Sequence, residues 1–180
     1  METYISILRA INVGRRKILM TDLKALYEEL NLKEIVTYIQ SGNVIFKTGK
    51  KISTQVLANK IQQLIAKKYQ FDVPVIIRTG DEMKKTIAVN PFLKQKGINL
   101  EKLHITFLAE NPEQVNVKVI QNLDYTPDKF VIIDNDVYLY CPNGYGITKL
   151  SNGFFENKLK VTATTRNWRT VNILAELAAK

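Results

Sequence analysis

The order of strand-like and helix-like segments limits the possible folds of this chain more than any other feature of its sequence. In the first 90 residues, short runs of apolar and β-branched residues alternate with segments whose apolar residues recur at helical spacing. The predicted elements are a strand at 4–9, a helix beginning at Thr21, strands at 34–39 and 44–47, a helix beginning at Ser53 and a strand at 73–79. This order is typical of a ferredoxin-like, or split βαβ, unit.

The same order begins again after residue 102. We predict strands at 103–109, 130–133 and 137–141, a helix from near Pro112, and two closing helices at about 151–159 and 167–178. In this interpretation a helix replaces the last strand of the second unit. The chain is therefore predicted to be an α+β protein of two tandem ferredoxin-like (split βαβ) units with antiparallel sheets and extra C-terminal helices. We expect an N-terminal subdomain at 1–90 and a C-terminal subdomain with the closing helices at 91–180.

Local signals position two helices more closely. Thr79 and Glu82 match a capping box, which predicts a short helix that ends before Asn90 and Pro91. The segment after residue 167 carries an apolar stripe that includes Trp168. We therefore expect the last helix to bury Trp168 against the rest of the fold.

Charge favours anionic partners. The chain has 26 Lys and Arg against 17 Asp and Glu, a formal net charge of +9. Most of the excess lies in residues 1–90, which hold 15 basic and 8 acidic side chains. Nucleic acid, nucleotides and phosphorylated metabolites all fit such a balance, and a need for solubility alone also explains it.

Cysteine use and hydropathy bear on location. The single cysteine, Cys141, allows no disulfide within the chain, which is typical of a reducing cytosol. The sequence starts without the basic and apolar regions of a signal peptide, and no stretch approaches the roughly 20 apolar residues that span a membrane. We expect a soluble, cytoplasmic protein without a membrane partner.

The predicted topology brings two polar loops together. In a split βαβ unit, the end of the first strand and the hairpin after the second strand lie at the same edge of the sheet. Here these are the loop 10–20, which is long for its type and holds Arg15, Arg16 and Lys17, and the turn 40–43. The loop leads into a helix N-terminus, which favours an anion the size of a phosphate. The alternatives are solvated loop charges and an ordinary turn.

Motifs for known chemistries are absent. Neither the P-loop nor the Gly-x-Gly-x-x-Gly pattern occurs, and strand 44–47 lacks the aromatic signature of RNA-binding sheets. With His104 and Cys141 as the only residues of their types, a His/Cys metal cluster is excluded and a Ser-His-Asp triad depends on one residue. We expect no metal and no cofactor, and the sequence assigns no reaction.

A second polar segment lies near the C-terminus. Thr164 to Trp168 combines hydroxyl groups with Arg166 and Asn167 at a predicted helix start, which makes it another candidate anion site. Arg166 could equally pair with an acidic residue within the fold, because an arginine at a helix start opposes the helix dipole.

Several segments resemble a bacterial family catalogued as domain of unknown function 1697. They are Leu8-Arg9-Ala10-Ile11-Asn12-Val13-Gly14, Tyr38-Ile39-Gln40-Ser41-Gly42-Asn43-Val44, Tyr140-Cys141-Pro142-Asn143-Gly144, Thr148-Lys149-Leu150-Ser151 and Thr164-Thr165-Arg166-Asn167-Trp168. Arg15-Arg16-Lys17 departs from the Gly-rich loop of many relatives. The resemblance implies an α+β protein with duplicated ferredoxin-like halves and implies no activity or catalytic residues.

Two functional hypotheses follow. The first is a binding site for a small anionic ligand, a nucleotide or phosphometabolite, and its candidate residues are Arg9, Asn12, Gly14, Lys17, Gln40, Ser41, Asn43, Arg166 and Asn167. The alternative is nonspecific nucleic-acid binding by the basic N-terminal surface, with Arg15, Arg16, Lys17, Lys47, Lys50, Lys51, Lys67 and Lys68.

Overall fold

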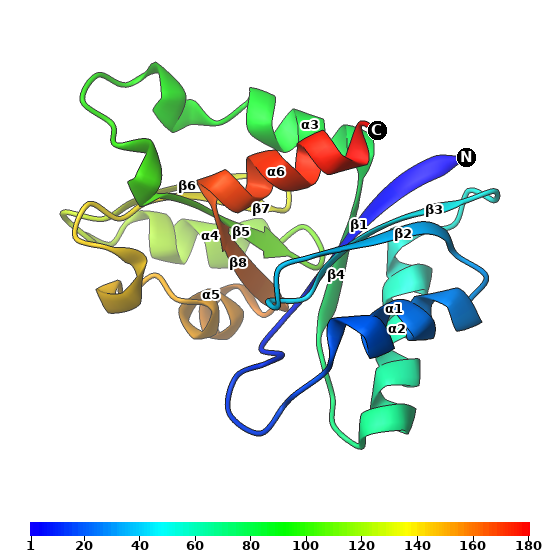
Figure 1. Ribbon diagram of the computed structural model, residues 1–180. Helices are drawn as coiled ribbons and strands as arrows, with labels where there is room; N and C mark the ends of the chain where they lie inside the picture. The colour runs from blue at the N-terminus through cyan, green and yellow to red at the C-terminus, as the bar shows by residue number, and fades with distance from the viewer. The chain divides into compact units, whose positions relative to one another are not determined.

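The first half of the chain builds a four-stranded antiparallel sheet with the strand order β2-β3-β1-β4 (Figure 1). The computed structural model describes residues 1–180. In this half the elements are β1 (Glu2–Leu8), α1 (Met20–Glu29), β2 (Lys33–Tyr38), β3 (Asn43–Thr48), α2 (Thr54–Tyr69), β4 (Val75–Thr79) and α3 (Gly80–Ala88).

The second half repeats this architecture with the strand order β6-β7-β5-β8. Two short 3-10 helices, η1 (Pro91–Lys94) and η2 (Leu100–Lys102), come first. The remaining elements are β5 (Leu103–Leu108), α4 (Gln114–Gln121), β6 (Lys129–Ile133), β7 (Asp136–Tyr140), η3 (Tyr145–Ile147), α5 (Asn152–Leu159), β8 (Ala163–Asn167) and α6 (Trp168–Ala178). The predicted fold class, α+β with duplicated ferredoxin-like units and antiparallel sheets, is confirmed.

The chain forms two compact units, and both divisions between them fall inside helices. One unit is Met1–Lys84 together with Ile173–Lys180, and the other is Lys85–Asn172. The divisions lie within α3 and α6.

The core of the first unit lies between its sheet and the helices α1 and α2, which run side by side on one face (Figure 1). From β1 this core includes Tyr4 and Leu8, which face the same side of the sheet because side chains along a strand alternate between its two faces. Tyr4 stacks on Phe46 at 5.6 Å between ring centroids, and the edge of Tyr27 meets the same ring at 5.4 Å. The buried Tyr27 hydroxyl is satisfied by a hydrogen bond with the Ser6 hydroxyl.

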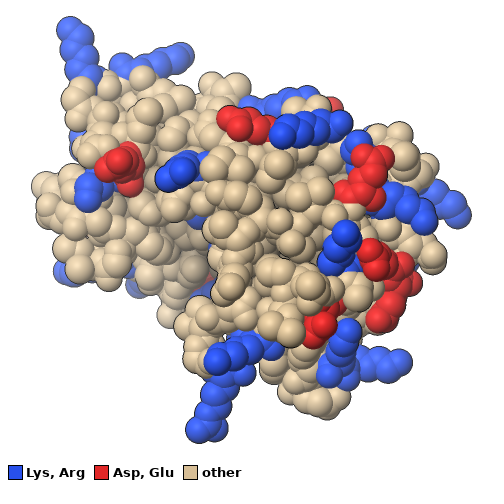
Figure 2. Space-filling model, viewed as in Figure 1, with Lys and Arg blue, Asp and Glu red and all other residues tan.

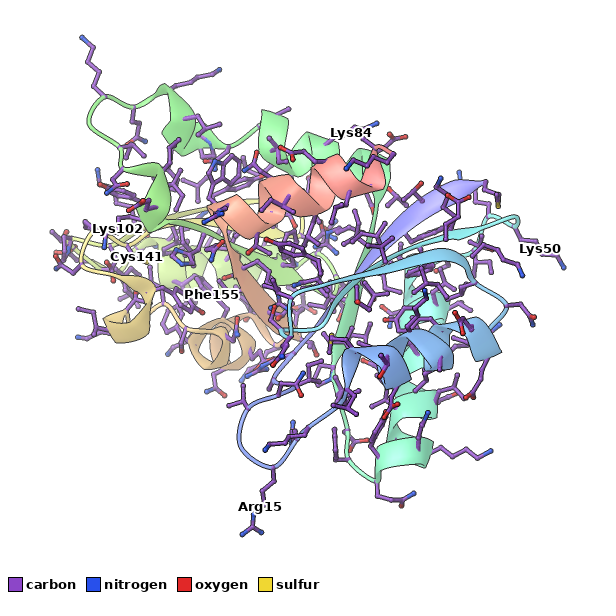
Figure 3. All side chains as sticks on the ribbon, in the orientation of Figure 1. Arg15, Lys50, Lys84, Lys102, Cys141 and Phe155 are labelled. Atoms are coloured by element: carbon purple, nitrogen blue, oxygen red, sulfur yellow. The ribbon has the colours of Figure 1, made fainter.

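The second unit buries an equivalent core under α4 and α5. Leu108 and Leu139 from the sheet pack with Ile120 of α4 and with Phe155 and Leu159 of α5. The labelled Phe155 lies among the side chains of this unit in Figure 3. Each unit therefore has its own apolar layer between a sheet and two helices.

One strand of the second sheet was not predicted. Residues 163–167 form β8, which pairs with β5 as the fourth strand of the second sheet, and no helix replaces it. The segment from Val161 contains four β-branched residues, which favour a strand next to the open edge of β5. The last helix, predicted at about 167–178, agrees with α6, which begins at Trp168.

The helix caps agree with the sequence at some positions and differ at others. The capping box of α3 is formed: the Glu82 N–H donates to Thr79 Oγ1 (3.1 Å) and the Thr79 N–H donates to Glu82 Oε2 (2.7 Å). Thr21 does not cap α1, because the helix begins at Met20 with Leu19 in the cap position. Trp168 is buried as predicted, with 8% of its surface exposed.

Candidate functional site

The two loops predicted to meet do so at one edge of the first sheet. They are residues 9–19, between β1 and α1, and residues 39–42, between β2 and β3, and we call them the paired loops. The Asn12 side chain donates a hydrogen bond from Nδ2 to the Gln40 carbonyl oxygen at 2.7 Å. The Leu8 N–H donates to the Gly42 carbonyl oxygen at 2.9 Å. The split βαβ topology thus produces the predicted juxtaposition.

Asn12 fixes the shape of the first loop. Its Oδ1 accepts a hydrogen bond from the Ile18 N–H (2.9 Å), while its own N–H donates to the Arg16 carbonyl oxygen (2.6 Å). Its backbone has a φ of 58°, in the left-handed region that asparagine tolerates better than most residues. Both polar ends of the Asn12 amide are therefore used within the protein.

Asn43 fixes the turn in a similar way. It is fully buried, and its Nδ2 donates to Ser41 Oγ (2.9 Å) and to the Tyr38 carbonyl oxygen (3.2 Å). Gly42 between them has a φ of +79°, and a Cβ there would lie 2.6 Å from Ile11 Cδ1. The turn therefore needs glycine both for its backbone angle and for its close packing against the first loop.

Backbone strain gathers in the paired loops. Among the residues with positive φ are Ala10 (56°) and Ile39 (50°), together with Asn12, Gly14 and Gly42. A positive φ is uncommon for alanine and a clear outlier for a β-branched isoleucine. Strain of this kind persists where the surrounding contacts enforce it, and it is concentrated at functional sites.

Between the paired loops lies a pocket of about 420 Å³, which we call the loop pocket. Its lining is Asn12, Lys17, Ile18, Leu19, Met20, Thr21 and Gln40. Three of the predicted site residues, Asn12, Lys17 and Gln40, are therefore brought together around one cavity. The first turn of α1 also reaches this cavity, and no side chain caps that helix.

The other predicted residues of the first unit lie outside the loop pocket. Gly14 is exposed at the tip of the loop, and Arg15 points away from the ribbon in Figure 3. Arg9 anchors the end of β1, because its N–H donates to the Pro74 carbonyl oxygen (2.9 Å). Ser41 takes part in the turn described above. Of the three consecutive cations at 15–17, only Lys17 lines the pocket.

Arg166 and Asn167 belong to the second unit. Nη1 of Arg166 donates to Thr164 Oγ1 (3.2 Å) and to the Thr165 carbonyl oxygen (2.9 Å). Desolvation lowers the pKa of the Arg166 guanidinium to about 10, so it remains charged at neutral pH. Asn167 is the N-cap of α6, with Oδ1 accepting from the Thr170 N–H at 2.8 Å. This cap satisfies one N–H group of the first turn of α6.

The chain's only histidine and only cysteine are placed within the second unit. The His104 ring stacks on Tyr145 at 4.8 Å, and burial lowers the pKa of His104. Cys141 is fully buried, and burial raises the pKa of its thiol to about 11, which keeps it protonated at neutral pH. No three His, Cys, Asp or Glu side chains lie together as metal ligands would.

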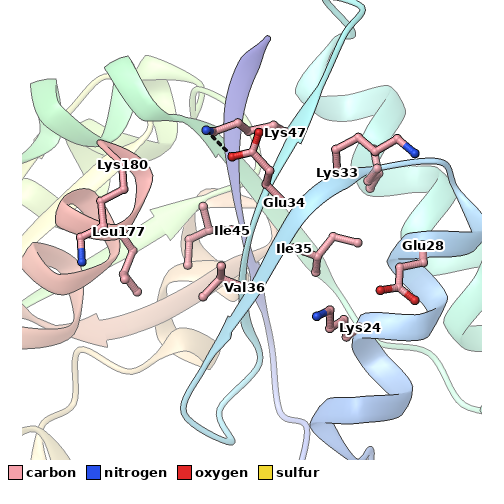
Figure 4. Close-up of a pocket in the computed structure, with 11 residues that line it drawn as sticks. Lys24, Glu28, Lys33, Glu34, Ile35, Val36, Ile45, Lys47, Leu177 and Lys180 are labelled. Carbon is pink, nitrogen blue, oxygen red and sulfur yellow. Dashed lines mark hydrogen bonds and ion pairs between the residues drawn. The ribbon is translucent and has the colours of Figure 1, made fainter.

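A larger pocket of about 640 Å³ follows β2, and sequence reasoning did not anticipate it (Figure 4). Its apolar part is lined by Leu32, Ile35, Val36, Ile45 and Leu177. At its rim Lys47 pairs with Glu34 at 2.5 Å. The pocket lies along an edge strand whose register shifts between Lys33 and Val36, a signal that appears only once the strands are paired.

Surface charge is mixed. Lys and Arg side chains are spread over the visible face, and Asp and Glu side chains stand between several of them (Figure 2). None of the helices is long and apolar enough to cross a membrane.

The second unit provides an internal reference for the paired loops. The connection between β5 and α4 is five residues long, 109–113, whereas its counterpart between β1 and α1 has eleven, 9–19. The turn between β6 and β7 has two residues, 134–135, against four in the first unit. Comparing the two halves element by element could have shown this extension from the sequence.

Comparison with known proteins agrees with the fold and the family resemblance. The structure matches that of conserved bacterial protein SP0830 from Streptococcus pneumoniae with a TM-score of 0.78 and 20% identity, over 100% of this chain and 99% of that one. No curated protein matches this chain significantly. The model of the family described as "Protein of unknown function (DUF1697)" matches residues 1–138, which include both paired loops, while the segments after residue 138 that resembled the family lie beyond it. The chain therefore belongs to the DUF1697 family of proteins of unknown function.

Proposed function

We propose that this protein binds a small anionic ligand, such as a nucleotide or a phosphorylated metabolite, in the loop pocket. The observation that carries the proposal is the convergence of Lys17, Gln40 and the uncapped start of α1 on one cavity. The volume of about 420 Å³ falls within the range of small-molecule sites, roughly 300–1,000 Å³.

The electrostatics of the pocket favour an anion. The first N–H groups of a helix have no partner within the helix, and the dipole adds a partial positive charge at the same end. In α1 no side-chain oxygen fills this position. A bound phosphate or carboxylate would accept hydrogen bonds from these groups, and the Lys17 ammonium would add to the attraction.

The predicted residues divide into two roles. Asn12, Ser41 and Asn43 form hydrogen bonds inside the paired loops and give the pocket its shape. Lys17 and Gln40 line the cavity, and no hydrogen bond from either side chain to another part of the protein is found. We therefore assign ligand contact to Lys17 and Gln40 and a positioning role to the three smaller polar residues.

Thermal-shift measurements with a panel of nucleotides and phosphorylated metabolites test the proposal. A ligand at about 100 times its Kd stabilises the folded state by about 2.7 kcal/mol. We expect at least one stabiliser, and we expect its effect to be reduced in Lys17→Gln and Gln40→Ala. Lys60→Gln, at an exposed lysine on α2, is the matched control and should respond like the wild type.

Two results would contradict the proposal. One is the absence of any stabiliser across the panel. The other is a stabiliser whose effect is the same in Lys17→Gln, Gln40→Ala and Lys60→Gln. Asn12→Ala is less suitable as a test, because it removes hydrogen bonds that shape the loop and so alters the pocket itself.

The nucleic-acid alternative rests on charge alone, and no contact in the structure favours it. Lys67 and Lys68 lie in the last turn of α2, where cations stabilise the helix dipole. Lys47 pairs with Glu34. A gel shift of nucleic acid by this protein at low salt, with binding that falls steeply as salt is added, would support this alternative.

A further inference from the structure

One wall of the loop pocket is apolar. Ile18, Leu19 and Met20 follow one another along it, with Ile18 buried and Leu19 68% exposed. The polar side of the pocket is small, because both ends of the Asn12 amide already bond to the Ile18 N–H and the Gln40 carbonyl oxygen. This leaves Lys17, Gln40 and Thr21 as side chains that can bond to a ligand.

Leu19 is an unusual residue for its position. It occupies the N-cap of α1, where Ser, Thr, Asp and Asn are strongly preferred. Thr79, Ser151 and Asn167 accept hydrogen bonds from the first turns of α3, α5 and α6. The starts of α2 and α4 are uncapped like that of α1, but their N-cap residues are polar, Ser53 and Glu113. At α1 the chain instead carries an exposed leucine beside a cavity. Residues that break a local rule in this way occur at functional sites and at strained sites.

The chemistry of the wall discriminates between the two ligand types that an anion site allows. A phosphorylated sugar would place hydroxyl groups against Ile18, Leu19 and Met20, where they would lose water without gaining partners. A phosphate attached to a planar or apolar group would cover the exposed part of Leu19 and so remove apolar surface from water. The second type fits both sides of the pocket.

We infer that the ligand of the loop pocket is amphiphilic, a nucleoside monophosphate or a molecule of the same build, whose phosphate lies near Lys17 and whose base lies on the wall of Ile18, Leu19 and Met20. This inference rests on the proposed function and narrows it. Compact polar anions, including inorganic phosphate and sugar phosphates, are poor ligands of the same site.

Calorimetric titration with four probes tests the inference. The probes are AMP, ribose 5-phosphate, inorganic phosphate and adenosine. AMP should bind at least about tenfold more tightly than ribose 5-phosphate, a difference of about 1.4 kcal/mol. AMP binding should also show a negative heat-capacity change, since apolar surface is buried. Adenosine should bind more weakly than AMP, because it lacks the charge that Lys17 attracts.

Two variants separate the apolar and the anionic parts. Leu19→Ala should reduce the preference for AMP over ribose 5-phosphate, and it leaves the first N–H groups of α1 without a side-chain acceptor, as in the wild type. Leu123→Ala, at an exposed leucine of the second unit, is its control and should keep the preference. Lys17→Gln should weaken AMP and ribose 5-phosphate by the same factor.

The outcomes distinguish this inference from the proposed function. If ribose 5-phosphate binds as tightly as AMP, or if Leu19→Ala keeps the preference, the inference is wrong and the anion site stands. If adenosine binds as tightly as AMP, the phosphate plays no part and both fail. If none of the four probes binds and no other anion stabilises the protein, the proposed function fails and the inference fails with it.

Discussion

The two units share a strand register but differ in their loops. Ile5 pairs with Arg78 in the first sheet, and Ile105 pairs with Arg166 in the second. In β4 and in β8 the residue after this arginine, Thr79 or Asn167, is the N-cap of the following helix.

The hydrogen bonds that close each sheet edge also correspond. The Leu8 N–H donates to the Gly42 carbonyl oxygen and the Leu108 N–H donates to the Asn135 carbonyl oxygen, both at 2.9 Å. The short loops of the second unit show that a ferredoxin-like sheet closes without the additional residues of the paired loops. The extension in the first unit is therefore not needed to close the sheet, and several of its residues line the loop pocket.

The largest expected effect on the free energy of unfolding is at the first residue of α6, where the two units differ in burial. By the shared register, Trp168 corresponds to Gly80 of α3. Trp168→Ala should lower the free energy of unfolding by roughly 3–5 kcal/mol, because it truncates a buried aromatic side chain. Urea denaturation measures this, and a change below about 0.5 kcal/mol, the size found at exposed sites, would show that α6 is not docked.

Gly80→Ala is the matched control for that variant. A Cβ at Gly80 would lie 3.8 Å from the nearest atoms of Thr3, an ordinary contact. The change should therefore be tolerated, and reduced entropy of the unfolded chain should add about 0.4–1 kcal/mol of stability. A loss of stability in Gly80→Ala would mean that the start of α3, like that of α6, is sensitive to a change of side chain.

The next effect concerns the glycines of the paired loops. Gly42→Ala should cost about 2–4 kcal/mol, since it combines a strained φ of +79° with a clash against Ile11 and Leu8. Gly14→Ala has the strained φ of +61° alone, with open space around it, and should cost about 1 kcal/mol. Urea denaturation of both variants measures the difference between their free energies of unfolding. Equal costs would show that the turn at 39–42 does not pack closely on the first loop.

A pH profile would sharpen the comparison between equivalent positions of β1 and β5. His104 stands where the first unit has Tyr4. Burial lowers the pKa of His104, so below the unfolded value of about 6.5 the unfolded chain binds more protons than the folded one. Stability should be fully present above that pH and decline as the pH falls toward the folded pKa.

His104→Gln tests that expectation, because the chain has no other histidine. Unfolding curves for both proteins between pH 8 and pH 5.5 should show a decline in the wild type that is smaller in the variant. Parallel profiles would mean that the His104 side chain is as well solvated in the folded chain as in the unfolded one.

The smallest effect is expected at the tip of the first loop. Arg15 and Arg16 are exposed and do not line the loop pocket, so the double variant Arg15→Ala/Arg16→Ala should change stability by less than about 0.5 kcal/mol. It should also bind ligand nearly as the wild type does, whereas Lys17→Gln should not. A strong loss of binding in the double variant would indicate that the anion binds at the loop surface and not in the loop pocket.

The element order was readable from the sequence because it follows from local patterns. Apolar periodicity identified the helices, and the capping box at Thr79 was correct to the residue. The strand β8 was missed because Thr164 and Asn167 are also typical of helix starts, and only the open edge of β5 decides between the two structures. Local propensity carries no information about such an edge.

The meeting of the paired loops was predictable from the sequence, but the contacts within them were not. Topology alone placed the paired loops together. The roles of Asn12 and Asn43 depend on burial and on bonds to main-chain atoms, which the residue types do not reveal. Leu19 was overlooked for the same reason. An apolar residue in a loop can be recognised as unusual only when its exposure and its place before α1 are known.

The bond between the paired loops has a consequence for how this family can diversify. Asn12 reaches the main-chain carbonyl of residue 40, and the Gln40 side chain takes no part in that bond. Any amino acid at position 40 offers the same carbonyl, so the side chain there can change while the loops stay joined. A substitution at position 40 can therefore change the lining of the loop pocket while the loops keep their bond, whereas a substitution at position 12 removes that bond.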